Sequence, residues 1–69
     1  MPKRVEVTRA GDLPIAAQLA EMQRWLGEEG VRATDLHAVR ILNARVTYEA
    51  TFQDAAAAAR FVQAFGRGV

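Results

Sequence analysis

The spacing of the apolar residues changes repeatedly along the chain, and this alternation constrains the fold more than any other feature of the sequence. Residues 3–9 alternate apolar and polar side chains, which predicts a strand. Residues 13–29 instead carry apolar side chains three and four positions apart, which predicts a helix with one apolar stripe: Ile15, Leu19, Met22 and Leu26. Asp12 is placed to cap this helix, Pro14 fits its first turn, and Gly30 is placed to end it.

Residues 35–52 predict a β-hairpin around a two-residue turn at Asn43 and Ala44. This register makes one face apolar and the other mostly polar. The predicted apolar-face pairs are Ile41 with Val46, Val39 with Tyr48, and His37 with Ala50. The predicted opposite-face pairs are Leu42 with Arg45, Arg40 with Thr47, Ala38 with Glu49, and Leu36 with Thr51. A three-residue loop, which would shift the register by one residue, is the alternative because Ala44 suits a type I′ turn poorly.

Residues 55–65 predict a second helix, with Asp54 as its N-cap and Gly66 directly after its end. The chain of residues 1–69 is therefore predicted to be a single α+β domain with the order βαββα, in which two helices cover one face of a three-stranded antiparallel sheet. The predicted core consists of Val5, Val7, Ile15, Leu19, Met22, Leu26, Val39, Ile41, Val46, Tyr48, Phe52, Ala58, Phe61, Val62 and Phe65.

This order of elements resembles the ferredoxin-like βαββαβ fold, with the last strand missing or reduced to residues 67–69. The resemblance covers nearly the whole chain and consists of the element order alone, which many unrelated functions share. It implies that the first strand lies at an edge of the sheet. The unpaired backbone groups of an edge strand can pair with another chain, whereas charged residues such as Lys3 and Arg4 discourage unintended pairing.

The composition argues against several functional classes. The sequence has no cysteine and no serine, and its nine basic and eight acidic residues give no strong field for nucleic acid or anionic lipid. His37 is the only histidine, and its predicted inward position beside Ala50 favours a structural role. No residue spacing predicts a metal site or a phosphate-binding loop, so we expect no catalysis and no cofactor. RNA binding is not expected either, because Tyr48 and Phe52 are predicted to point inward.

The sequence also bears on the compartment. The basic first residues are not followed by an apolar stretch of the kind found in secretory signals, and the longest run of small uncharged residues, 55–59, is too short to span a membrane. We therefore expect a cytoplasmic protein without membrane contact. Arginine supplies nearly all the positive charge and alanine is abundant, which is typical of a high-GC bacterial genome.

The features that remain predict a non-catalytic protein–protein interaction module that forms a homodimer. One candidate interface is the edge of the first strand, made of Lys3, Arg4, Val5 and Glu6. The other is a flank of the first helix, made of Glu21, Arg24 and Trp25, because Trp25 lies about 100° from the apolar stripe. The alternative function is a small-molecule-sensing regulatory domain with its ligand at a dimer interface near residues 8–12.

Overall fold

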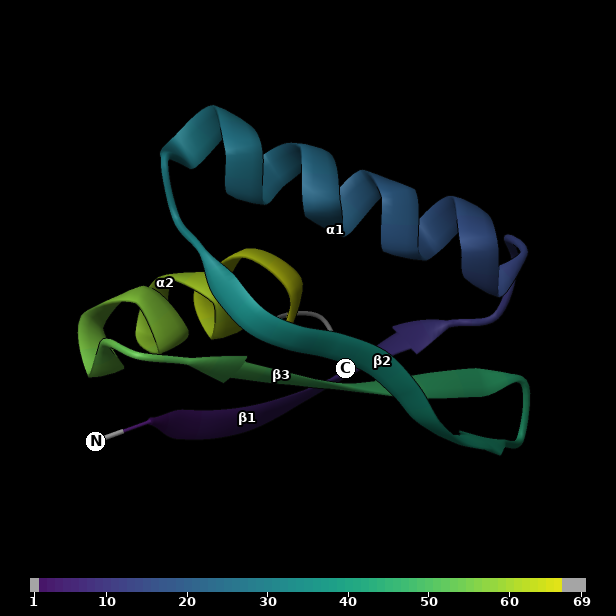
Figure 1. Ribbon diagram of the computed structural model, residues 1–69. Coiled ribbons are helices and arrows are strands. Elements are labelled where there is room, and N and C mark those ends of the chain that lie inside the picture. Colours follow the sequence, from purple (N-terminus) through teal and green to yellow (C-terminus); the bar gives the residue numbers. More distant parts are fainter. Residues whose placement is uncertain (1, 67–69) are drawn as a thin grey trace.

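The computed structural model describes residues 2–66, and the predicted α+β order is confirmed. The elements are β1 (Lys3–Ala10), α1 (Ile15–Glu29), β2 (Ala33–Leu42), β3 (Arg45–Phe52) and α2 (Ala55–Phe65). The strands form one antiparallel sheet in the order β1-β3-β2, and both helices lie on the same side of it (Figure 1). The first strand is thus at an edge of the described sheet, as predicted, while the proposed remnant of a last strand at 67–69 lies outside the described residues.

The hairpin turn is the predicted two-residue turn. Leu42 pairs with Arg45, and the two residues between them both have positive φ, 53° at Asn43 and 59° at Ala44, as a type I′ turn requires. The three-residue alternative is therefore wrong. The backbone amide of Gly11 donates a hydrogen bond of 2.7 Å to the Ala44 carbonyl oxygen, which ties the β1–α1 loop to the turn.

The predicted hairpin register holds only from the turn to Arg40, which pairs with Thr47. Val39 is an extra residue in β2, a β-bulge, so Ala38 rather than Val39 lies opposite Tyr48. The predicted pairs of Val39, His37, Ala38 and Leu36 are consequently wrong. A second irregularity falls at Thr34. The bulge lets Leu36 and Ala38 pack against the core although they differ in parity from Ile41.

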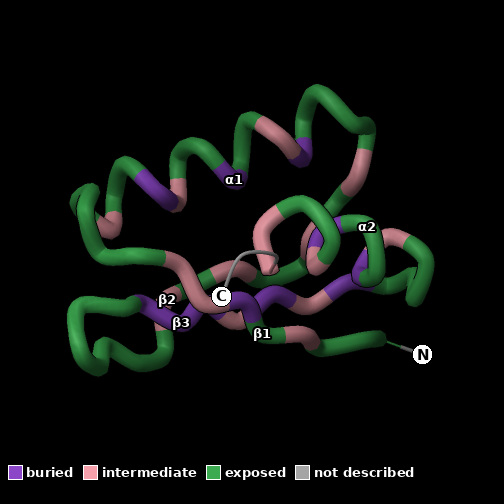
Figure 2. Tube along the Cα trace, turned by 180° about the vertical axis from the view of Figure 1, so that it is seen from behind, coloured by how far each residue is buried: buried purple, intermediate pink, exposed green. Residues whose placement is uncertain are grey.

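The core lies between the inner face of β3 and the undersides of the two helices, where Figure 2 shows the buried segments. Val46, Tyr48, Ala50 and Phe52 of β3 are all buried. Ala50 was not among the predicted core residues, whereas the other three were. Burial also confirms the predicted core residues Val7, Met22, Leu26, Ala58 and Phe61. Five more, Val5, Ile15, Leu19, Val62 and Phe65, are partly buried against this core. Val39 and Ile41 are exposed, so their placement in the core was wrong.

One polar side chain, Gln18, is buried among these apolar groups. The Tyr48 hydroxyl donates a hydrogen bond to Gln18 Oε1, and Gln18 Nε2 donates to the carbonyl oxygen of Ala10 at 2.6 Å. The three groups satisfy one another, as buried polar atoms require. This chain of hydrogen bonds fixes α1 against the end of β1 and the middle of β3.

The helix ends agree in part with the sequence. Gly30 ends α1 in the left-handed conformation at φ 68°, and the Asp54 carboxylate accepts a hydrogen bond of 3.0 Å from the Ala56 amide at the start of α2. Asp12 does not cap α1, however. The cap residue is Pro14, whose carbonyl oxygen accepts a hydrogen bond of 3.1 Å from the Gln18 amide, and the helix starts at Ile15.

Candidate interaction surfaces

The first candidate surface, the free edge of β1, has an uninterrupted backbone. β1 pairs with β3 without a register shift, from Lys3 opposite Phe52 to Ala10 opposite Arg45. In the described part of the chain, no strand lies on the other side of β1. The structure therefore brings Lys3, Arg4, Val5 and Glu6 together on one open edge, as the sequence predicted.

The charged side chains of this edge are well exposed. Arg4 and Glu6 both point to the face of the sheet that the helices leave open, with 69% and 51% of their side chains accessible. The Arg4 guanidinium lies 3.8 Å from the Glu49 carboxylate, and Glu6 lies 3.6 Å from Arg40. Exposed ion pairs at such distances are weak, so both charges remain available to another partner.

The second candidate surface, the flank around Trp25, is used largely by the fold itself. The Trp25 ring meets the rings of Phe61 and Phe65 edge to face, with centroids 6.0 and 5.5 Å apart. Arg9 completes this contact, because its guanidinium lies 2.6 Å from the Glu21 carboxylate and 5.2 Å from the centre of the Phe65 ring. Trp25 thus joins α1 to α2, which explains its partial burial.

A shallow hollow remains on this flank. It has a volume of about 250 Å³ and is lined by Glu21, Arg24, Trp25, Glu28 and Phe65. The three predicted residues Glu21, Arg24 and Trp25 therefore do share one surface. Among the described residues, no hydrogen bond or ion pair connects them to the residues 3–6 at the β1 edge.

His37 does not lie where the sequence placed it. The bulge at Val39 puts it opposite Glu49 on the open face of the sheet, and its side chain is about half exposed. Its Nδ1 lies 3.1 Å from the Asp35 carboxylate and its Nε2 lies 3.7 Å from that of Glu49. These contacts lie on the open face of the sheet. Tyr48 and Phe52, the aromatic residues of β3, point to the core instead, as predicted.

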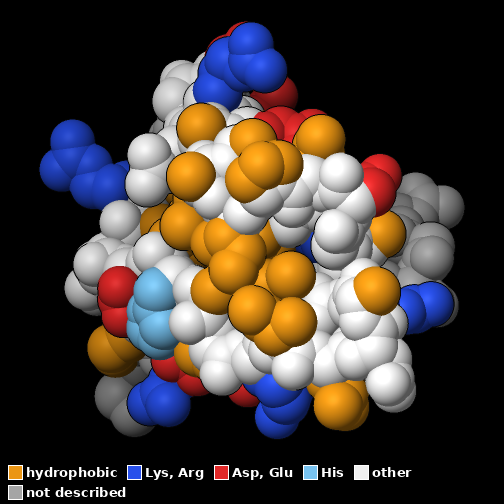
Figure 3. Space-filling view, turned by 90° about the vertical axis from the view of Figure 1, so that its right-hand side faces the viewer, with side chains coloured by type: hydrophobic (Ala, Val, Ile, Leu, Met, Phe, Trp, Pro, Cys, Tyr) orange, Lys and Arg blue, Asp and Glu red, His pale blue; other side chains and the backbone are white. Residues whose placement is uncertain are grey.

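An apolar surface at the hairpin end of the molecule was not predicted from the sequence. Leu13, Val39, Ile41 and Leu42 are 50%, 43%, 65% and 63% exposed, and hydrophobic side chains gather in the middle of this end in Figure 3. α2 contacts β1 and β3 and α1 contacts β2, and neither helix buries these four side chains. The adjacent apolar residues Ile41 and Leu42 were the signal, because neighbours in a strand point to opposite faces.

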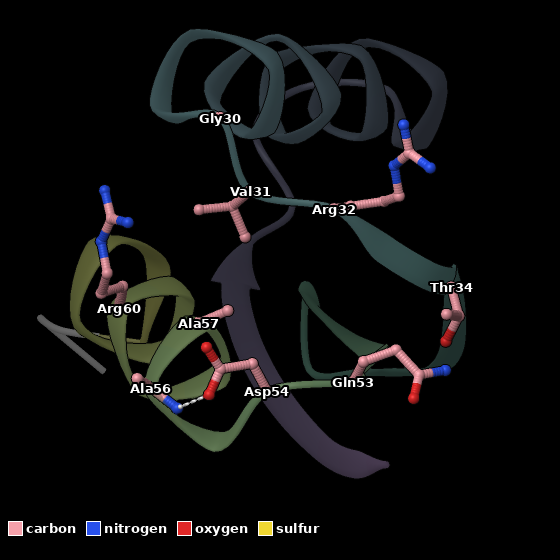
Figure 4. Close-up of a pocket in the computed structure, with 9 residues that line it drawn as sticks. All are labelled: Gly30, Val31, Arg32, Thr34, Gln53, Asp54, Ala56, Ala57 and Arg60. Atoms are coloured by element: carbon pink, nitrogen blue, oxygen red, sulfur yellow. Dashed lines mark hydrogen bonds between the residues drawn. The ribbon is translucent and has the colours of Figure 1, made fainter.

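A larger hollow, of about 390 Å³, lies between the end of α1 and the start of α2 (Figure 4). Two of its three charged side chains have partners within the fold. Arg60 pairs with Glu29, and the Asp54 carboxylate caps α2. The residues that line this hollow are Gly30, Val31, Arg32, Thr34, Gln53, Asp54, Ala56, Ala57 and Arg60.

The loop at residues 8–12, where the alternative function would place a ligand, lines neither of these two hollows. Gly11 is held against the hairpin turn, and a Cβ at this position would lie 2.8 Å from the Ala44 carbonyl oxygen. The loop is therefore packed closely against backbone. Ligand sensing at this loop stays a prediction.

Residues 2–66 hold no group of three or more side chains suited to binding a metal ion, and no helix there is long and apolar enough to cross a membrane. No family model matches this chain, and no curated protein or solved structure is found to be similar to it. The contacts of the chain are thus the basis for a functional proposal.

Proposed function

We propose that this chain is a non-catalytic protein–protein interaction module of the cytoplasm that works as a homodimer. The observation that carries the proposal is the open edge of β1, eight residues long and paired without interruption to β3 on its other side. Alternate backbone groups of such an edge point away from the sheet, and a second strand satisfies them. The edge is available among the described residues, and its two ends carry no bulge.

The chemistry of the surfaces supports a binding role more than a catalytic one. The cluster of His37, Asp35 and Glu49 lies on the face of the sheet that the helices leave open, and its His37 and Asp35 side chains are about half exposed. General acid–base catalysis needs such groups beside a bound substrate, in a site that excludes water. The sequence also lacks serine and cysteine, the commonest nucleophiles.

Sedimentation equilibrium over a wide range of protein concentration tests the proposal, with the absorbance of Trp25 and Tyr48 as the signal. We expect the weight-average mass to rise from the 7.6 kDa of one chain toward twice that value. A mass that stays at 7.6 kDa at every concentration would contradict the homodimer.

Variants then separate the two candidate surfaces. Arg24→Glu changes the charge of the Trp25 flank at an exposed position and should leave the dimer intact. It is a cleaner probe than Trp25→Ala, which would also remove the contacts with Phe61 and Phe65 that join the helices. A weaker dimer in Arg24→Glu would instead assign the interface to that flank.

A further inference from the structure

We infer that two copies pair β1 with β1 in an antiparallel arrangement, with the two-fold axis between the two copies of Val5 (an axis at Val5). This pairing builds one six-stranded sheet. This inference rests on the proposed homodimer and specifies its interface. Because the two-fold axis is perpendicular to the sheet, the helices of both copies stay on the same face. The strand order becomes β2-β3-β1 followed by the same three strands of the partner in reverse.

Symmetry allows only a few registers. Residues that lie directly opposite each other in an antiparallel pair point to the same face of the sheet. The axis therefore lies between two copies of the same β1 residue, because neighbouring residues of a strand point to opposite faces. An axis at Val5 places Arg4 opposite the partner's Glu6, and by symmetry Glu6 opposite the partner's Arg4. Opposite charges in such cross-strand positions attract.

The neighbouring registers lack this complementarity. An axis at Arg4 or at Glu6 places that side chain opposite its own copy, which brings like charges together. An axis at Val7 pairs Glu6 with the partner's Thr8 and Val5 with the partner's Arg9, so no opposite charges meet. The charge sequence of the β1 edge thus favours Val5 as the centre.

The side chains concerned can make these contacts without leaving the fold. Arg4 and Glu6 are mostly exposed on the open face, and their in-chain partners Glu49 and Arg40 lie at 3.8 and 3.6 Å. Val5, between them, points to the helix side and is half-buried against the core. Its pairing with the partner's Val5 would bury the apolar surface that remains.

The surface of α2 is compatible with this arrangement. α2 runs along β1 and β3, with Phe65 near Arg9 at one end, so the α2 helices of two copies would lie antiparallel near the axis. Ala56, Ala57 and Arg60 line the hollow on the α1 side of α2. By the helical period, Ala55 and Ala59 then lie on the opposite side, toward the β1 edge, and both are exposed. Alanine at these positions allows the close approach of two helices.

Charge exchange tests the register directly. Arg4→Glu places acidic residues opposite each other, and Glu6→Arg does the same with basic residues, so each should raise the dissociation constant of the dimer about tenfold or more. The double variant Arg4→Glu/Glu6→Arg restores opposite charges and should dimerise within a few-fold of the original chain. An equimolar mixture of the two single variants should form a heterodimer, because both facing pairs, position 4 with the partner's position 6 and position 6 with the partner's position 4, then join opposite charges.

The double variant shows whether the weaker dimerisation of the single variants comes from lost ion pairs within one chain. The double variant still lacks the Arg4–Glu49 and Glu6–Arg40 pairs, so its recovery cannot come from them. Thermal unfolding of each variant at a concentration where it is monomeric checks that the fold is retained. The dissociation constants come from sedimentation equilibrium, and ion-exchange chromatography of the mixture separates heterodimer from the two single species.

The outcomes distinguish this inference from the proposed function. If the original chain dimerises and the single variants do so equally well, the β1 register is wrong while the homodimer stands. If the single variants weaken the dimer but neither the double variant nor the mixture restores dimerisation, the axis is not at Val5. If the original chain is monomeric throughout, the proposed homodimer itself is wrong.

Discussion

The two edges of the sheet differ in a way that bears on function. β1 is paired to β3 without a register shift, whereas β2 is interrupted at Thr34 and again at Val39. Bulges twist an edge and break the regular row of backbone groups, which is one way in which proteins prevent unwanted strand pairing. The protected edge is also the one beside the exposed apolar residues Val39 and Ile41. The β2 edge is therefore protected against strand pairing by its bulges, whereas the β1 edge is regular.

This comparison shows that an open edge is not simply the result of a small sheet. Both edges flank the same strand, β3, whose inner side chains are buried along its length. The difference arises within β1 and β2 themselves, from one charge pattern and from two extra residues. Changes in each of the three strands test this difference.

Deletion of Val39 should have the largest effect. It removes the extra residue from β2, so that Ala38 and Arg40 become adjacent opposite Tyr48 and Thr47. We expect the fold to persist and the β2 edge to become regular from Asp35 to Leu42, so that each molecule has two open edges and forms large assemblies. Light scattering during size-exclusion chromatography measures the mass. Val39→Thr, which keeps the bulge, is the control, and a deletion variant that remains dimeric would show that the bulge does not guard this edge.

Tyr48→Phe acts on the strand that both edges share. It leaves Gln18 Oε1 buried without its donor, which should lower the free energy of unfolding by about 1–3 kcal/mol. The dissociation constant of the dimer should change little, because neither edge is altered. Chemical denaturation at several protein concentrations separates the two quantities. A large loss of dimerisation together with unchanged unfolding would contradict this division between core and edge.

The same residue gives a pH dependence. Burial raises the pKa of Tyr48 above its ordinary value of 10.0, and the Arg9 guanidinium opposes part of this effect. The folded chain then holds the phenol proton more tightly than the unfolded chain does. The resulting stabilisation is present below pH 10 and is lost as the pH rises through the folded-state pKa. Denaturation between pH 8 and pH 11, in about half-unit steps, should show a decline that is smaller in Tyr48→Phe.

A lysine should affect the dissociation constant of the dimer on the β1 edge but not on the β2 edge. Val5→Lys puts two ammonium groups near the two-fold axis and should raise the dissociation constant about tenfold. Val39→Lys places the same charge on the bulged edge and should leave the constant unchanged. Sedimentation equilibrium compares the two variants with the original chain. Equal weakening by both would mean that the two edges do not differ in use.

Much of the fold could be predicted because local signals agree with one another. The Asn43-Ala44 turn, the Asp54 cap and the Gly30 helix end are each defined by a few neighbouring residues. The edge position of Lys3, Arg4, Val5 and Glu6 was also predictable, because it follows from the order of the elements.

The rest depended on contacts between distant residues. The bulge at Val39 changes the face of His37, and the sequence shows it only as a change of parity between Leu36, Ala38 and Ile41. Gln18 lies within the apolar stripe of α1, but its partners Tyr48 and Ala10 are on two different strands. The four exposed apolar side chains of the hairpin end stay uncovered by either helix, which no single position reveals.

The turn at Ala44 has an evolutionary consequence. An alanine with φ of 59° occupies a left-handed conformation that costs about 1–2 kcal/mol, whereas glycine adopts it without this cost. The hydrogen bond that the Gly11 amide donates to the Ala44 carbonyl oxygen does not remove the cost. Alanine and glycine codons differ by one nucleotide. A lineage carrying this chain therefore has a stabilising substitution within a single mutational step, which could offset a destabilising change elsewhere, including one that reshapes the β1 edge for a different partner.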